Sequence, residues 1–130
     1  MQNPYAMHLY EYAIVRYMPD AARGEFVNIG LLMMCKRRRW IRTEISLQTE
    51  KLQAMAPDSD AGAIDRQCDV FRQICSGKPA DHPIASLPAE ERFRWLTAVR
   101  SASIVTSRPH PGKCDDLDST FARLYSELVL

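Results

Sequence analysis

The chain has 130 residues, of which 46% are hydrophobic and 25% charged, the composition of an ordinary globular protein. Its 17 basic and 16 acidic residues nearly cancel, which excludes a general electrostatic attraction to nucleic acid or to an anionic membrane. A chain of this length fits one domain, so we expect a flexible tail over residues 1–6 and a single domain over residues 7–130.

Three consecutive strands are predicted first, over about Leu9–Met18, Glu25–Lys36 and Trp40–Leu47. The first two carry large apolar side chains on both faces, as interior strands do, whereas the third alternates and so has one face in water. Residues 19–24 contain the Pro, Asp and Gly of a turn, and the three strands therefore predict an antiparallel meander. Within the second strand, Gly30 indicates a bulge or the close approach of another group.

Helices are expected next. Thr49 can cap a short helical turn that stops at Pro57. Residues 58–60 offer caps for a longer helix that continues to about Ser76 and ends at Gly77. The apolar residues of this helix have the spacing of one buried stripe. The stripe consists of Ile64, Cys68, Phe71 and Cys75.

The last part of the chain predicts a helix, a strand and a second helix. A helix is expected over about Ala89–Ala98, and β-branched residues predict a fourth strand over Ala102–Ser107. The prolines of residues 108–113 exclude regular structure there. Asp115 and Asp116 can cap the final helix. Its apolar stripe consists of Leu117, Phe121, Leu124 and Leu128.

This order predicts a two-layer α+β domain, an antiparallel β-meander plus one later strand, with three to four helices packed on one sheet face. Both apolar stripes would then pack against the same side of the meander. The chain shows no signal peptide, and its longest apolar run, Ile29–Cys35, is too short to span a bilayer. We therefore expect a soluble cytoplasmic protein that does not bind membranes.

The cysteines are expected to be core residues, because no Cys-x-x-Cys pair is present and free cysteine packs as a small hydrophobe. No metal and no cofactor is expected. The cysteines are Cys35, Cys68, Cys75 and Cys114.

Polar residues interrupt the first two strands at Arg16, Glu25 and Asn28. Burying such groups is costly unless each finds a partner. One register of the hairpin places Arg16 beside Asn28, and a slip of one residue places it beside Glu25. Either pairing would give a hydrogen bond across the sheet. The cluster is therefore interpreted either as a structural pair or as the polar floor of a ligand pocket.

The loop after the fourth strand is the second candidate site, because it collects reactive and charged groups between a strand end and a helix start. Two acidic residues at the helix cap would repel a phosphate, and one His with one Cys is only half of a metal site. The candidate residues are Ser107, Arg108, His110, Cys114 and Asp115.

The basic tip between the second and third strands is the third candidate site. Four consecutive basic residues, Lys36–Arg39, could contact phosphates while Trp40 stacks on a base. A solvated hairpin tip is the alternative, and the neutral net charge favours it. The candidate nucleic-acid contacts are Arg37, Arg38, Arg39 and Trp40.

The segment YEYAIVRYMPDAARGEFVNIGLLMMC, followed by SASIVTSRPHPGKCDD, resembles an uncharacterised bacterial family catalogued as domain of unknown function 3037. The features that carry the resemblance are Tyr10-x-Tyr12-Ala13, Arg16, the run from Glu25 to Gly30, Phe93-x-Trp95-Leu96 and Cys114-Asp115. The family has no established activity. Its genes lie beside those of HipA-like protein kinases, so the resemblance implies an accessory or regulatory partner of such a kinase.

The leading hypothesis is a non-catalytic cytoplasmic domain that binds a protein partner, with a HipA-like kinase as the candidate. The sequence leaves open whether the protein is an enzyme and favours a non-catalytic role, because the usual phosphate-loop, nucleophile-elbow and zinc-protease motifs are absent from it. The alternative is a hydrolase or nucleotide-acting enzyme, which requires the two polar clusters to converge. Its acid–base candidates are Glu25, His110 and Asp115, with Arg16 and Asn28 in the same pocket. Nucleic-acid binding through Lys36–Arg39 is the second alternative.

Overall fold

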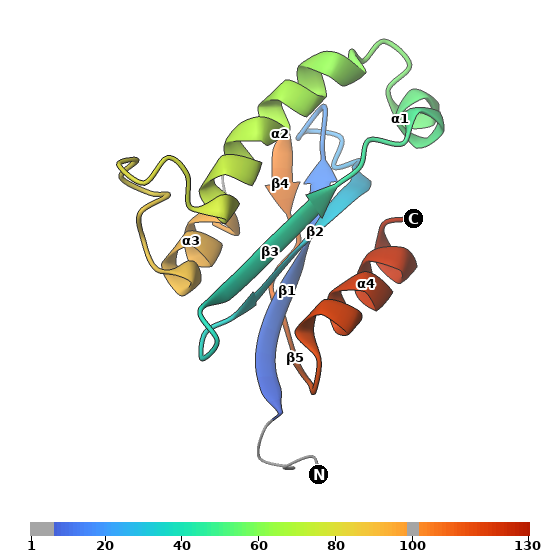
Figure 1. The fold of residues 1–130 in the computed structure, drawn as a ribbon. Coiled ribbons are helices and arrows are strands. Elements are labelled where there is room, and N and C mark those ends of the chain that lie inside the picture. The colour runs from blue at the N-terminus through green and yellow to red at the C-terminus, as the bar shows by residue number, and fades with distance from the viewer. Residues whose placement is uncertain (1–6, 99–101) are drawn as a thin grey trace.

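The computed structural model describes residues 7–98 and 102–130, so the tail expected over residues 1–6 lies outside the described residues. Within the described residues, five antiparallel strands form one sheet (Figure 1). The strand order is β3-β2-β1-β4, and β5 also pairs with β1. The strands are β1 (His8–Tyr17), β2 (Val27–Cys35), β3 (Trp40–Ile45), β4 (Ile104–Thr106) and β5 (His110–Cys114).

One edge of the sheet is split between two short strands. β4 and β5 lie end to end beside β1, on the side away from β2. At the break, the Ser107 amide donates to the Ile14 carbonyl (2.9 Å), and the Ser107 Oγ accepts from the Ile14 amide (2.8 Å). The prediction that residues 108–113 form no regular structure was wrong, because β5 begins at His110. An edge strand tolerates Pro111, since its ring nitrogen can face away from the neighbouring strand.

Four helices lie within the described residues. They are α1 (Thr49–Met55), α2 (Ala61–Ser76), α3 (Ala89–Leu96) and α4 (Leu117–Leu128). The carboxylates of Asp60 and Asp116 cap α2 and α4, as the sequence predicted. Gly77 ends α2 with a φ of 76°, where glycine carries no steric penalty. Thr49 was expected as the cap of α1 but is its first residue, and Gln48 takes the cap position without a side-chain hydrogen bond.

Helices cover both faces of the sheet (Figure 1). Phe71 of α2 and Phe93 of α3 pack on one face with Leu32, and Leu52 of α1 joins that group. Phe121 of α4 packs on the other face. The α+β class and the antiparallel sheet are confirmed. The two-layer arrangement with both apolar stripes on one face was wrong, because β2 is apolar on both faces and needs a cover on each.

Gly30 of β2 lies at a bulge and at a close approach, the two possibilities that the sequence raised. The register pairs Val15 with Gly30 but Arg16 with Asn28, so Ile29 is an extra residue in β2. A Cβ at Gly30 would lie 2.6 Å from the backbone oxygen of Glu44 in β3. The glycine therefore allows β2 and β3 to approach each other at the bulge.

Candidate functional site

The helix α4 leaves part of its sheet face uncovered. Leu31 and Met33 of β2 are fully buried in the group that packs against α4, whereas their register partners Ile14 and Tyr12 of β1 are only half buried. We call this uncovered part of β1, β4 and β5 the open shelf. The alternation along strands and the register place five residues on it. They are Tyr12, Ile14, Arg16, Val105 and His110.

The register places Arg16 opposite Asn28, which selects the first of the two pairings that the sequence allowed. The two side chains nevertheless do not hydrogen-bond to each other. Asn28 Nδ2 donates to the carbonyl of Leu128 (3.2 Å) at the end of α4. Asn28 Oδ1 and Arg16 Nε are both buried and have no hydrogen-bond partner among the described residues. Two unmatched polar atoms therefore lie on neighbouring strands at one end of the open shelf.

The Arg16 guanidinium stacks on an aromatic ring and not on an acid. Its Cζ lies 4.1 Å from the centroid of the Phe26 ring, a cation–π contact. Phe26 itself is 42% exposed. Burial lowers the pKa of Arg16, and no carboxylate among the described residues opposes this effect. The cation is thus partly removed from water without a counter-ion, which is unfavourable in free energy.

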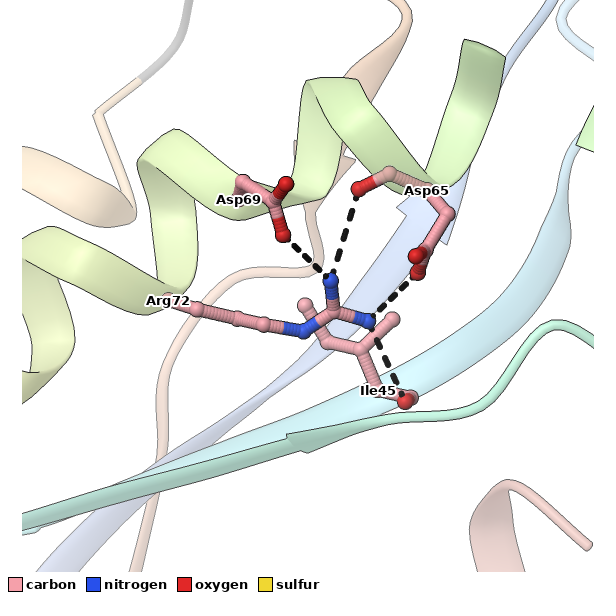
Figure 2. Close-up of polar contacts among 4 residues, drawn as sticks. All are labelled: Ile45, Asp65, Asp69 and Arg72. Carbon is pink, nitrogen blue, oxygen red and sulfur yellow. Dashed lines mark hydrogen bonds and ion pairs between the residues drawn. The ribbon is translucent and has the colours of Figure 1, made fainter. Parts of the chain in front are cut away.

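Arg72 and Arg94, in contrast, each pair with acidic side chains. Arg72 of α2 donates to Asp65 Oδ1 (2.8 Å) and Asp69 Oδ1 (3.0 Å), and also reaches the carbonyl of Ile45 at the end of β3 (Figure 2). Burial alone would lower the pKa of Arg72, but the two carboxylates outweigh it and the pKa is raised. A hydrogen bond from Arg94 to Glu11 is the main cause that raises the pKa of Arg94. Among the described residues, Arg16 has no acidic partner of this kind.

Glu25, an acid–base candidate, lies away from Arg16. It is exposed, and it forms an ion pair of 2.7 Å with Arg23 in the loop before β2. Glu25 also lines a surface cavity of about 350 Å³ together with Tyr17 and Met55. Tyr17 and Met55 pack with the helices of the opposite sheet face. The structure therefore separates Glu25 from the open shelf.

His110 lies on the open shelf but far from Arg16. Its ring stacks on Tyr12 with 5.1 Å between centroids. Tyr12 and Arg16 are four residues apart on β1, which at ~3.3 Å per residue is about 13 Å. An acid–base group must reach the reacting proton directly or through one water. The polar groups predicted for one enzyme pocket are therefore not brought together.

The other residues of the second cluster have separate positions. The Ser107 hydroxyl is used inside the sheet, where it also donates to the carbonyl of Arg108 (3.1 Å), and the Arg108 side chain is exposed. Cys114 is buried beside α4, and Asp115 is exposed next to the helix cap. Like Cys114, the other three cysteines are free and buried, as the sequence predicted for core residues.

At the basic tip, Lys36, Arg37, Arg38 and Arg39 are all exposed in the turn between β2 and β3. The ring of Trp40 packs edge-on against Phe121 of α4, with 6.4 Å between centroids. Trp40 is half buried and lines a surface pocket with Arg38. Nucleic-acid binding at the tip stays a prediction.

Phe26 is the residue of this site that the sequence reasoning missed. In the sequence it stands out only as part of the run from Glu25 to Gly30 that carries the family resemblance. Because side chains two apart on a strand share a face, the spacing of Phe26 and Asn28 already indicated that both lie on one side of the sheet. Their pairing with Arg16 depended on the hairpin register, which the sequence left open even though Gly30 indicated a bulge.

Comparisons with known proteins identify a family and nothing finer. No curated protein and no solved structure matches the chain. Within the described residues, no helix is long and apolar enough to cross a membrane. One family model, described as "Protein of unknown function (DUF3037)", matches residues 12–129, which is nearly the whole chain. The chain therefore belongs to the DUF3037 family.

Proposed function

We propose that the protein is a non-catalytic domain that binds a protein partner through the open shelf. The observation that carries this proposal is the uncovered sheet surface at whose end Arg16 and Asn28 keep unmatched polar groups. Half-buried apolar side chains, Ile14 and Val105, adjoin these groups, and exposed Phe26 lies against Arg16. A binding partner can cover such an apolar surface and supply hydrogen-bond partners to its few unmatched polar atoms.

The separation of the acid–base candidates supports binding over catalysis. Glu25 and His110 lie on different parts of the molecule, and neither lies beside Arg16 as a general base would have to. We further propose that the domain works in the bacterial cytoplasm. The free thiols of all its cysteines fit a reducing compartment.

A HipA-like kinase from the source organism is the first partner to test, because the family resemblance suggests it. The kinase is used as bait for the full chain at near-physiological expression. Two shelf variants, Val105→Glu and Phe26→Ser, are compared with Val70→Glu. Val70 is a suitable control because it is 55% exposed on α2, which covers the opposite face of the sheet.

The expected result is capture of the wild type and of Val70→Glu, with loss of capture for both shelf variants. A melting curve for each variant checks that it remains folded. Capture that is unchanged by the shelf variants would contradict the proposed surface. Failure to capture the wild type would remove the kinase as the partner.

A further inference from the structure

Resting on this proposed function, we infer that Arg16 and Asn28 bind the free C-terminal carboxylate of the partner chain. Arg16 stacks on Phe26 with no acidic partner among the described residues, and Asn28 Oδ1 lies opposite it without a donor. A ligand that satisfies both residues therefore offers an anionic acceptor to Arg16 and an N–H donor to Asn28 Oδ1.

The two requirements lie close together in space. Arg16 and Asn28 are register partners on adjacent antiparallel strands, whose Cα atoms are about 4.5–5.5 Å apart. Arginine only donates hydrogen bonds, and Asn28 Oδ1 only accepts them, while Asn28 Nδ2 already donates to the carbonyl of Leu128. A complementary group therefore carries an acceptor and a donor within a few bonds of each other.

The last residue of a polypeptide has this arrangement. Its α-carboxylate and its own amide N–H are attached to the same carbon, so one rotation sets their relative position. The carboxylate of an Asp or Glu side chain is joined to its amide by further rotatable bonds, and fixing these on binding costs entropy. A carboxylate also matches the planar fork of a guanidinium at two points, which an ammonium group cannot reproduce.

The surroundings add a place for the side chain of that last residue. Ile14 and Val105 flank Arg16 on the open shelf, and both are half buried. Arg16 Nε and Asn28 Oδ1 are buried in the free protein, so binding requires side chains around them to move. The Phe26 ring lies against the Arg16 guanidinium and is 42% exposed, and it is the side chain that turns aside in this proposal. An apolar C-terminal residue, such as leucine, fits this wall of side chains.

The test uses small probes and needs no partner protein. N-acetyl-leucine carries the carboxylate, the amide and an apolar side chain. N-acetyl-leucinamide lacks the charge, and N-acetyl-aspartyl-N-methylamide carries a carboxylate only in its side chain. Each probe is titrated into the full-length ¹⁵N-labelled protein while the side-chain resonances of Arg16 and Asn28 are followed by NMR. Backbone resonances show whether each variant is folded.

We expect N-acetyl-leucine to shift both side-chain resonances saturably, with a Kd on the order of 1 mM, as suits a ligand of this size. N-acetyl-leucinamide should bind at least tenfold more weakly. Arg16→Met and Arg16→Lys should each lose at least tenfold in affinity, and the lysine variant keeps the charge if the methionine variant does not fold. Arg123→Met is the matched control, because it removes an exposed arginine of α4, and should change affinity less than twofold.

The inference would be overturned if N-acetyl-leucinamide bound as tightly as N-acetyl-leucine. It would also be overturned if N-acetyl-leucine bound Arg16→Met as tightly as the wild type. Tighter binding of the aspartyl probe would overturn the choice of a chain terminus. The kinase capture separates this inference from the proposed function. If Arg16→Met is captured like the wild type while Phe26→Ser is not, only the carboxylate site fails. If N-acetyl-leucine binds but capture never depends on the shelf, the proposed function fails and the site remains.

Discussion

Replacing Phe121 with alanine should destabilise the protein more than most single substitutions. The side chain is fully buried between α4 and the sheet. Its ring contacts Trp40 edge-on and Tyr125 in parallel, each with 6.4 Å between centroids, and Arg42 lies 4.3 Å above it. Truncation of a buried Phe costs about 3–5 kcal/mol in the free energy of unfolding. The aromatic and cation contacts place Phe121 in the upper part of that range.

The expected change in melting temperature follows from the size of the protein. At ~2.1 cal/mol/K per residue, the unfolding entropy of 130 residues is about 0.27 kcal/mol/K. Each kcal/mol therefore lowers the midpoint by about 4 °C, and Phe121→Ala by about 10–20 °C. Circular dichroism melts measure this directly. Arg38→Ala at the exposed tip is the control and should change stability by less than about 0.5 kcal/mol.

A second comparison tests which face of the sheet α4 covers. Phe71 and Phe121 lie in the hydrophobic groups on opposite faces of the sheet, so the two side chains do not belong to one packed group. The free-energy losses of Phe71→Ala and Phe121→Ala should add to within about 0.5 kcal/mol. If both helices instead packed side by side on one face, the double variant would show a clear coupling. If Phe121→Ala and Arg38→Ala caused similar small losses in the free energy of unfolding, the docking of α4 on the sheet would be refuted.

Three further predictions concern other parts of the molecule. Gly30→Ala should cost about 1–3 kcal/mol in a urea titration, because its Cβ would meet the fixed backbone oxygen of Glu44. The free-energy losses of Arg16→Met and Glu25→Gln, measured by thermal melts, should add in the double variant, since the two residues lie on different surfaces. A strong coupling energy would instead mean that the two side chains pair. Burial raises the pKa of Cys75 to about 12. The native state therefore favours the protonated thiol, so stability should fall as the pH rises from about 9 towards 12, and less so in Cys75→Ala.

Local patterns in the sequence predicted the elements better than their arrangement. The stripe that begins at Ile64 and the stop at Gly77 were sufficient for α2, because both signals lie within a few turns of one helix. The strand β5 was missed because Pro111 reads as a breaker unless the strand is known to lie at an edge. Whether a strand is at an edge depends on pairing with β1, a hundred residues earlier.

The candidate site was predicted in part for the same reason. The sequence identified Arg16 and Asn28 as polar residues in buried strands, and the structure places them opposite each other. The sequence left the register of the hairpin open, because Gly30 indicated a bulge but not how the bulge shifts the pairing between β1 and β2. The position of α4 over β2 could have been inferred from the run of apolar residues from Leu31 to Cys35, which leaves neither face of β2 polar.

The split edge formed by β4 and β5 limits the ways in which another chain can join this sheet. A long unbroken edge offers a row of free amide and carbonyl groups to an incoming strand, the geometry that also starts aggregation. Here the row is interrupted between β4 and β5, where Ser107 turns its own hydroxyl inward to Ile14, and Pro111 has no amide hydrogen to offer. Strand addition is therefore disfavoured at this edge of the sheet, and β3 forms the other edge.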